Sequence, residues 1–551
     1  MQEYSNKPDE GPGVFPSSEA RVRPPLRETE KHEIRNMTPK IKFIPSSART
    51  ILWIAVIGAL LVPFAVPASA IEVREPAVAG RFYPADPVKL LRAVNFYLAH
   101  AAEPDGKKPL AIIAPHAGYI YSGQICADAW RQAGGHDYDL LVILGINHTV
   151  AGFSGVSILP GGVYRTPLGD AKIDERFSAK LAAAAPEFSY LAAVHRQEHS
   201  VEVQIPFAQV LFPDTPLVVA VLGEDDPALC DRFARALAEA VKGRSALIVA
   251  SSDLSHYPSY EDACRVDRAV LEAAASMDPA AVRREIGARM AQGVANLSTC
   301  ACGAAAMTAV MTAAKHLGAK GARIVSYANS GDALLGRPDR VVGYGAVVYS
   351  AFYSKQASFP EPPPADEEAP LTESGKKALL CLARTTLTEA LKADALPLPR
   401  LAEPALNAAR GAFVTLKNRG QLRGCIGHMT ADRPLQKTVG AMAAQAAFKD
   451  RRFAPVSAGE LEDLEIEISV LTPYESVPGP EAIRIGTDGV VLKKLGKSAV
   501  FLPQVAVEQG WNKEEMLEHL CRKAGLPAGA WKEGAGLMTF QATVFSEHEF
   551  R

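Results

Sequence analysis

The sequence has little of what marks several common protein classes. Its formal net charge is −2 over 551 residues, so it lacks the basic excess that nucleic-acid-binding proteins normally carry. Its eight cysteines show neither a disulfide-framework spacing nor paired Cys-x-x-Cys motifs, and the close pair Cys300 and Cys302 is too tight for an ordinary structural zinc site. No internal repeat is present. The hydrophobic fraction of 48% instead indicates a globular chain, long enough for roughly three domains.

The first 70 residues read as a tail followed by a targeting segment. Residues 1–38 are rich in Pro, Glu, Arg and Ser without apolar periodicity, which predicts disorder. Residues 39–70 combine a basic start, an uncharged apolar run and the ending Ala68-Ser69-Ala70. This order is typical of a secretory signal peptide, and a single-span membrane anchor is the alternative. Both interpretations place the rest of the chain outside the cytoplasm, periplasmic, secreted or membrane-anchored. Met37 would be a more typical start than Met1.

Two folded domains follow. Residues 71–353 alternate apolar strands with amphipathic helices, which predicts an α/β domain whose mainly parallel sheet is covered by helices on both faces. Residues 354–370 form a Pro- and Glu-rich linker, and residues 371–551 predict a smaller α+β domain. The strands expected in the first domain cover residues 110–114, 140–145, 217–222, 246–251, 323–327 and 342–349.

Metal-binding side chains follow several of these expected strands. His116 and His148 come after the first two strands, Asp253 and His256 after the fourth, and Cys300 at the start of a late helix. A doubly wound sheet gathers such residues into one crevice. Imidazole with thiolate or carboxylate suits iron, copper or zinc. Taken singly, each histidine is also compatible with a turn or core position, and Cys300 with a small buried apolar residue.

Six stretches of the first domain carry a family pattern. They are Arg74 through Tyr83, Ile113 through Tyr119, Ile143 through His148, Tyr164 through Gly169, Glu198 through Glu202, and Ser251 through His256. In this order they resemble the Memo family, which shares its fold with the class III extradiol dioxygenases. The resemblance implies metal ligation by two histidines and a cysteine, here His116, His148 and Cys300, with Cys302 as the alternative cysteine.

The same resemblance implies a role for the neighbouring side chains. His199, Asp253 and His256 are the expected catalytic residues, with a histidine moving protons and Asp253 orienting His256. The expected activity is metal-centred, dioxygenase-like redox chemistry on a small molecule, with Fe(II) the first choice of metal and copper or zinc as alternatives. Two other functions stay open: a zinc-dependent hydrolase, and a metal-free module that binds a peptide or partner.

The second domain carries the stretch Gln421-Leu422-Arg423-Gly424-Cys425-Ile426-Gly427-His428. It predicts either a nucleophile site, with Cys425 attacking, His428 as base and Arg423 beside them, or a purely structural strand. This stretch, residues 450–453, 465–471 and 486–492, and Phe501 through Val505 resemble the AMMECR family. The two resemblances together suggest the AmmeMemoRadiSam grouping and a radical-SAM protein as partner.

Overall fold

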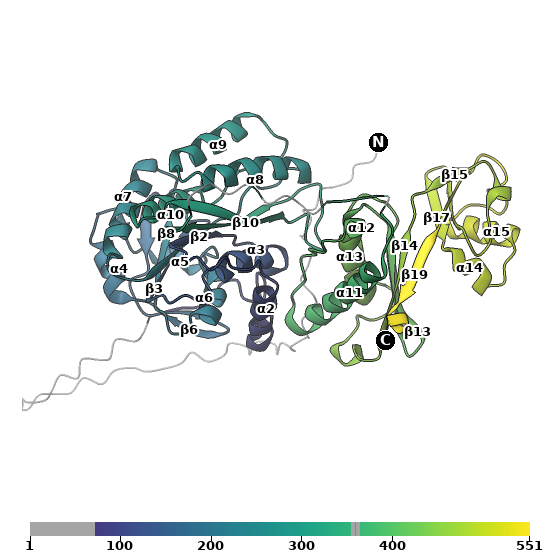
Figure 1. Cartoon of the computed structure of the whole chain (residues 1–551), viewed down its shortest axis with the longest axis horizontal. Coiled ribbons are helices and arrows are strands. Elements are labelled where there is room, and N and C mark those ends of the chain that lie inside the picture. Colours follow the sequence, from purple (N-terminus) through teal and green to yellow (C-terminus); the bar gives the residue numbers. More distant parts are fainter. Residues whose placement is uncertain (1–71, 354–358, 360–363, 368, 551) are drawn as a thin grey trace, which may run out of the picture. The chain divides into compact units, whose positions relative to one another are not determined.

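The computed structural model describes residues 72–353, 359, 364–367 and 369–550 (Figure 1). The predicted tail, the predicted signal segment and most of the predicted linker lie outside these residues. Within the described part of the chain, no helix is long and apolar enough to cross a membrane.

The first domain is built on one eight-stranded sheet with the order β10-β11-β2-β9-β3-β8-β4-β7. Its central strands β2, β9, β3 and β8 are parallel to one another. On one side β11 is antiparallel to both β2 and β10, and on the other β4 is antiparallel to β8 and parallel to the edge strand β7. The predicted α/β class is therefore confirmed. The bounds are β2 Ala111–Ala114, β3 Leu140–Ile146, β4 Val156–Ile158, β7 Phe188–Ser189, β8 Leu217–Leu222, β9 Ala246–Ser251, β10 Gly321–Asn329 and β11 Gly343–Ser350.

Helices cover both faces of this sheet, as the continuous apolar strands require. In β2, Ala111 and Ile113 enter one hydrophobic core and Ile112 and Ala114 enter the other. The first core is covered by α4 Glu175–Ala182, α7 Pro227–Ala240, α8 Tyr260–Ala275, α9 Pro279–Ala291 and α10 Ala304–His316, and the second by α2 Pro87–Ala99, α3 Tyr119–Arg131 and α6 Ile205–Leu211 (Figure 1). Burial on both faces leaves the strand ends as the place for polar side chains.

A small sheet ties the start of the described chain to this domain. Its order is β1-β5-β6, with β1 Val73–Arg74, β5 Val163–Thr166 and β6 Gly169–Lys172. Arg74 is buried, forms an ion pair with Glu202 and donates to the carbonyl oxygens of His195 and Glu198. Glu202 also accepts from the backbone N–H groups of Ala77 and Val78. The strand after the predicted signal segment is thus locked beside the loop that carries His199.

The second domain is α+β, as predicted, and contains two four-stranded sheets. One has the order β13-β12-β14-β19, and the other β15-β18-β16-β17. Residues 536–546 form β18 and β19, which are separated by Gln541 and belong to different sheets. The strands are β12 Ala412–Asn418, β13 Gln421–His428, β14 Leu464–Leu471, β15 Glu475–Val477, β16 Gly489–Lys494, β17 Lys497–Phe501, β18 Gly536–Phe540 and β19 Ala542–Ser546. The helices are α11 Glu373–Ala393, α12 Pro404–Asn407, α13 Leu435–Phe448, α14 Pro503–Glu508 and α15 Lys513–Lys523.

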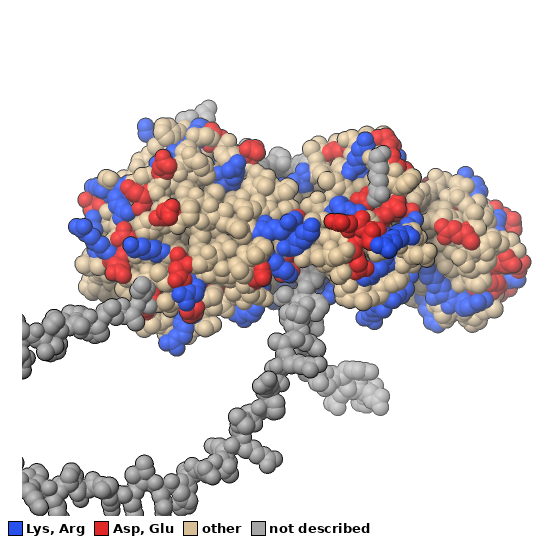
Figure 2. All heavy atoms as spheres, turned by 90° about the horizontal axis from the view of Figure 1, so that it is seen from below, with Lys and Arg blue, Asp and Glu red and all other residues tan. Residues whose placement is uncertain are grey.

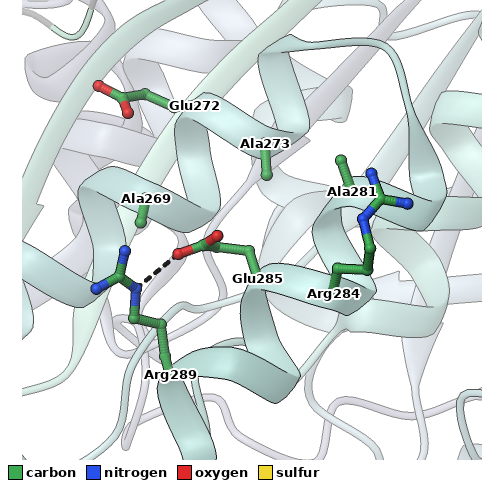
Figure 3. A pocket seen from close by; sticks show the side chains of 7 residues that line it. All are labelled: Ala269, Glu272, Ala273, Ala281, Arg284, Glu285 and Arg289. Carbon is green, nitrogen blue, oxygen red and sulfur yellow. Dashed lines mark hydrogen bonds and ion pairs between the residues drawn. The ribbon is translucent and has the colours of Figure 1, made fainter. Parts of the chain in front are cut away.

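The surface shows no field of a single sign on the face seen in Figure 2, where acidic and basic side chains are interspersed. A hollow of about 320 Å³ lies between α8 and α9, beside the ion pair of Glu285 and Arg289 (Figure 3). None of the sequence-predicted site residues lines this hollow.

Candidate metal centre

Three histidines from separate segments meet at the carboxyl end of the central strands. His116 follows β2 after a single proline, and His148 follows β3 after a single asparagine. His199 lies in the loop between α5 Ala192–Arg196 and the short 3₁₀ helix η2 Glu202–Gln204. Parallel strands deliver their following residues to one edge of the sheet, which explains why residues so far apart in sequence come together.

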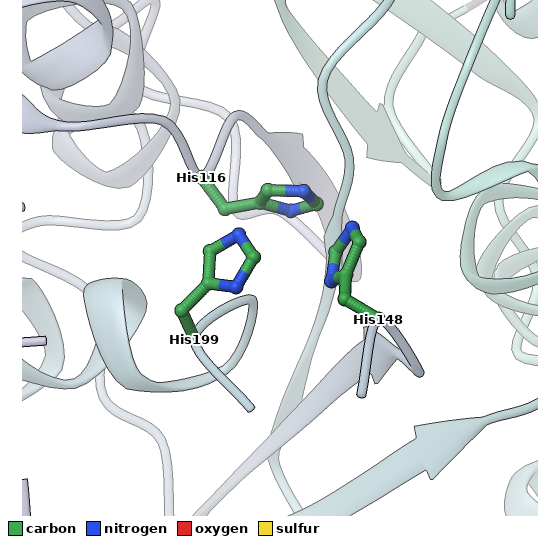
Figure 4. Close-up of side chains that lie close together, drawn as sticks. All are labelled: His116, His148 and His199. Atoms are coloured by element: carbon green, nitrogen blue, oxygen red, sulfur yellow. The ribbon is translucent and has the colours of Figure 1, made fainter. Parts of the chain in front are cut away.

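The three imidazole rings converge on one point (Figure 4). One ring nitrogen of each histidine lies within 4.8 Å of the corresponding atom of the other two. The ring of His116 is nearly perpendicular to the rings of His148 and His199, at 81° and 89°, and the latter two are stacked with centroids 4.5 Å apart. Three imidazoles at this spacing fit one metal ion, because each would supply a single nitrogen ligand.

A buried hydrogen-bond network fixes the ring of His116. Its Nδ1 lies 3.0 Å from the hydroxyl oxygen of Ser251, which donates its own proton to the carbonyl oxygen of Ser200. The Nε2 amide of Gln204 also donates to the Ser251 hydroxyl, at 3.0 Å. Because the only hydroxyl proton is already used, Nδ1 of His116 must be the donor to Ser251. Nε2 of His116 therefore carries the lone pair that a metal ligand requires, and it lies 3.2 Å from the sulfur of Cys302.

Glu198 orients the ring of His148, as Ser251 orients that of His116. One carboxylate oxygen lies 2.9 Å from Nδ1 of His148 and accepts from the backbone N–H of Ser200, and the other accepts from the backbone N–H of His148. Burial alone would raise the pKa of Glu198, but these hydrogen bonds, first that of the His148 side chain, lower it to about 2. Glu198 is thus an ionised carboxylate that orients His148 through its Nδ1–H.

Burial keeps two of the imidazoles neutral. The pKa of His116 is lowered to about 3, first by burial and then by the charge of His148. The pKa of His199 is lowered to about 4 by burial and by the charges of His116 and His148. A neutral imidazole has a lone pair available for a metal. This environment therefore favours metal binding by His116 and His199 over protonation of their rings.

The hydrogen bonds of Asp253 and His256 differ from the expected pairing of these two residues. Asp253 accepts from the backbone N–H groups of His116 and Ala117, at 2.7 and 3.3 Å, and so holds the turn after β2. Nδ1 of His256 lies 3.0 Å from the carbonyl oxygen of Leu254, which orients that ring instead. The pKa of Asp253 is raised, because burial outweighs the nearby charge of His256. Asp253 therefore positions His116, and its carboxylate also interacts electrostatically with His256.

The structure also corrects the choice of cysteine. The sulfur of Cys302 lies 3.2 Å from Nε2 of His116, whereas the sulfur of Cys300 faces the carbonyl oxygen of Ile286 on α9 at 3.9 Å. Cys300 is buried in the apolar core, and burial raises its pKa to about 11. Gly303 fixes the adjacent turn, since a Cβ there would lie 2.6 Å from the carbonyl oxygen of Ser251. Cys300 and Cys302 are two residues apart in an irregular turn, and their thiols point in different directions, toward α9 and toward His116.

The structure thus brings together His116, His148 and His199, and it places the thiol of Cys302 beside His116. Sequence reasoning treated His199 as catalytic and missed the orienting roles of Glu198, Ser251 and Gln204. Glu198 and Ser251 stood within the quoted motifs, next to a histidine or at a strand end, which is where an orienting group is expected. Gln204 carried no such signal, because its role depends on a contact with a distant strand.

In the second domain the predicted nucleophile and base are not brought together. Cys425 pairs with Thr415 and His428 with Ala412 in a regular antiparallel ladder, so the two side chains, three residues apart, lie on opposite faces of β13. Nε2 of His428 lies 2.7 Å from a carboxylate oxygen of Asp432. Arg423 is held by Glu460 and by the carbonyl oxygens of Ala454 and Pro455.

Comparison with known proteins agrees with this division of the chain. A family model described as Memo-like protein matches residues 74–348, and one described as AMMECR1 matches residues 380–545. A MEMO1 family protein of Methanococcoides burtonii is 37% identical over 279 residues, which cover 50% of this chain and 99% of that protein. Another, from Aeropyrum pernix, is 36% identical over 293 residues, with 50% and 99% coverage.

A solved structure was also found. The crystal structure of an uncharacterized protein from Pyrococcus horikoshii is 39% identical in sequence. The match covers 31% of this chain and 89% of that one, with a TM-score of 0.30.

Proposed function

The chain belongs to the Memo-like family through residues 74–348, and we propose that this domain binds one divalent metal ion for redox chemistry on a small molecule. The ligands in this proposal are His116, His148 and His199, with Cys302 beside them. The observation that carries it is the convergence of three imidazoles with ring nitrogens within 4.8 Å of one another, two of which are held through Nδ1 by hydrogen bonds to Ser251 and Glu198.

The donor set fits a transition metal. Imidazole nitrogens and a thiolate suit iron, copper or zinc, whereas magnesium or calcium would need oxygen ligands. Burial raises the pKa of Cys302 well above its usual value, so its thiol is protonated in the metal-free protein and would release that proton to become a ligand. We propose Fe(II) as the metal, with copper as the alternative redox ion. Zinc alone would favour a hydrolase.

The protein's own groups have separable tasks. Ser251 and Glu198 orient His116 and His148, and Asp253 holds the backbone that carries His116. His256 is oriented by the carbonyl oxygen of Leu254, and its Nε2 is the proposed proton acceptor. When bound, the metal would supply the redox couple.

Metal content of the purified chain tests this proposal, with the two cysteines as a matched pair. Wild type is expected to hold about one equivalent of iron or copper, and His116→Ala to hold almost none. Cys302→Ser is expected to lower the affinity for the metal, measured by competition with a chelator, whereas Cys300→Ser should leave it unchanged. Wild type without iron, copper or zinc above background would overturn the proposal, and peptide binding that survives a chelator would favour the metal-free module.

We also propose a partner and a cellular location for this protein. The presence of Memo-like and AMMECR1 domains in one chain supports action on a common substrate or partner, for which we propose a radical-SAM protein. The composition of residues 39–70 supports a location outside the cytoplasm. Cell fractionation with N-terminal sequencing of the mature protein tests the location, and co-purification with the radical-SAM protein tests the partner. A full-length cytoplasmic product would contradict the proposed location.

A further inference from the structure

Arg74 on β1 reaches the loop that carries His199. The arginine is buried, and its Nε donates to the carbonyl oxygen of His195 at 3.0 Å, while Nη2 donates to that of Glu198 at 2.6 Å. The guanidinium also lies over the ring of Tyr164 on β5, 4.7 Å from its centroid. Because the N–H donors of an arginine form a rigid planar fork, this one side chain fixes where the two carbonyl groups lie.

Glu202, at the far end of the same loop, completes this arrangement. Its carboxylate is fully buried, forms the ion pair with Arg74, and accepts from two backbone N–H groups that follow β1, at 2.8 and 2.9 Å. The hydroxyl of Tyr83 donates to it at 2.6 Å. A buried ion pair needs such additional hydrogen bonds to offset the loss of water. Residues 74–83 are therefore fastened to residues 195–202 at several points.

The peptide group that Arg74 holds belongs to two residues of the candidate metal centre. The carbonyl oxygen of Glu198 and the nitrogen of His199 are parts of one planar peptide unit, so a displacement of one moves the other. The carboxylate of Glu198 lies 2.9 Å from Nδ1 of His148. One hydrogen bond of Arg74 thus acts on His199 through the backbone and on His148 through the intervening carboxylate.

The end of the fastened segment also touches the residues that carry His116 and His199. The ring of Phe82 packs against the ring of His199, with centroids 4.9 Å apart. The carbonyl oxygen of Phe82 accepts at 2.7 Å from the backbone N–H of Tyr119, which begins α3 three residues after His116. Residues 74–83 therefore contact, directly or through one neighbour, each of the three histidine-bearing segments.

We propose that Arg74 is a positioning residue of the metal centre, and that it sets the placement of His148 and His199 relative to each other. It acts through the peptide group and the carboxylate of Glu198. This inference rests on the proposed metal site. An ion pair that only stabilised the fold would change metal binding no more than it changes the folded fraction. Positioning instead predicts a changed coordination geometry in protein that is fully folded.

Co(II) added to the metal-free full chain is the probe. It accepts the same nitrogen and sulfur ligands as iron, copper and zinc, its visible absorption spectrum reports the coordination geometry, and its titration gives the affinity. Arg74→Lys keeps a positive charge beside Glu202 but loses the fork that holds the two carbonyl oxygens. We expect a shifted spectrum and about tenfold weaker binding, the lower end for an outer partner of a metal ligand, because Arg74 acts one contact further away than Glu198.

Two control variants separate this effect from charge and from stability. Arg165→Gln changes an arginine of the same small sheet that pairs at the surface with Glu75 and Asp170, and it should leave spectrum and affinity unchanged. Leu237→Ala opens a cavity at a fully buried position on α7 and should destabilise the domain without altering the spectrum. Circular dichroism confirms that each variant is folded under the conditions of the titration.

The outcomes distinguish the role of Arg74 from the existence of the site. Folded Arg74→Lys with the spectrum and affinity of wild type would overturn the positioning role and leave the metal centre standing. The same spectral change in Leu237→Ala would also overturn that role, because the effect would then follow stability. Wild type that binds no Co(II) would overturn the metal centre and this inference with it. If Arg74→Lys does not fold, Glu202→Gln removes the charge that holds the guanidinium, and an unchanged spectrum and affinity in that variant would count equally against the proposal.

Discussion

The hydroxyl oxygen of Ser251 and Nδ1 of His116 lie 3.0 Å apart, and the hydroxyl proton of Ser251 points elsewhere, to the carbonyl oxygen of Ser200. Ser251 thus determines that Nε2, and not Nδ1, of His116 carries the available lone pair. Ser251 ends β9, the strand that pairs in parallel with β2, so the sheet itself holds the two groups in register.

Ser251→Ala is expected to weaken metal binding by about 10- to 100-fold, because His116 loses the acceptor that fixes its tautomer and ring orientation. The measurement is a competition titration with a chelator. Ser178→Ala is the matched control: Ser178 is also buried in the first domain, and its hydroxyl has no hydrogen-bond partner among the described residues. Equal affinity in the two variants would contradict the role given to Ser251.

Glu198→Gln tests the second orienting group. The amide can replace only one of the two carboxylate oxygens as acceptor, so either the Nδ1–H or the backbone N–H of His148 loses its partner. We expect about 10- to 100-fold weaker metal binding and a destabilisation of about 1–3 kcal/mol from the unsatisfied buried donor. Chemical denaturation gives the second quantity. Glu187→Gln, at a surface ion pair with Arg232, should change neither.

Asp267 makes the stability of the first domain depend on pH. Burial raises its pKa from 3.8 to about 7, against opposing hydrogen bonds from Ser255 and Tyr327. The folded state therefore holds a proton that the unfolded state has lost between these values, and this contribution to stability is present below about pH 4 and is lost as pH rises through about 7.

Asp267→Asn removes this titration. The free energy of unfolding of the variant minus that of wild type is expected to rise between pH 4 and pH 7 and then level off, by on the order of 4 kcal/mol at most. Urea denaturation across this pH range measures it. A difference that stays flat, or that falls with pH, would show that Asp267 does not titrate as the structure indicates.

Added metal should stabilise the chain against heat. A ligand that binds only the folded state at 100 times its dissociation constant contributes about 2.7 kcal/mol to stability. The unfolding temperature of the metal-free protein is therefore expected to rise when Fe(II) is added under anaerobic conditions and to fall again with a chelator. His148→Ala should abolish the rise. A rise that persists in this variant would place the stabilising metal elsewhere in the chain.

The layered sheet of the first domain could be predicted from the sequence because its strands, such as β3 and β8, are continuous apolar runs. Such a run is visible in a short stretch of sequence without knowledge of distant contacts. Sequence reasoning missed the short strands β4 to β7, whose two to four residues are too few for a clear period. It placed His116 and His148 at strand ends correctly. The family resemblance pointed to Cys300 rather than Cys302. The direction of a thiol within an irregular turn is set by packing against α9 and β9, which the spacing of residues does not reveal. The same limit hid Gln204, whose contacts are to Pro115 and Ser251.

The position of β2 also governs when the metal centre can exist. β2 pairs with β9 on one side and with β11, Gly343–Ser350, on the other, so its neighbours are made well over a hundred residues later. Contacts of such long sequence separation form late and slowly. During synthesis His116 therefore leaves the ribosome long before the strands that hold it, and Cys302 follows before β11 is made. In the proposed function, metal loading therefore comes after β9 has been synthesised, because a chain stalled before Ser251 would carry His116 without the group that orients it.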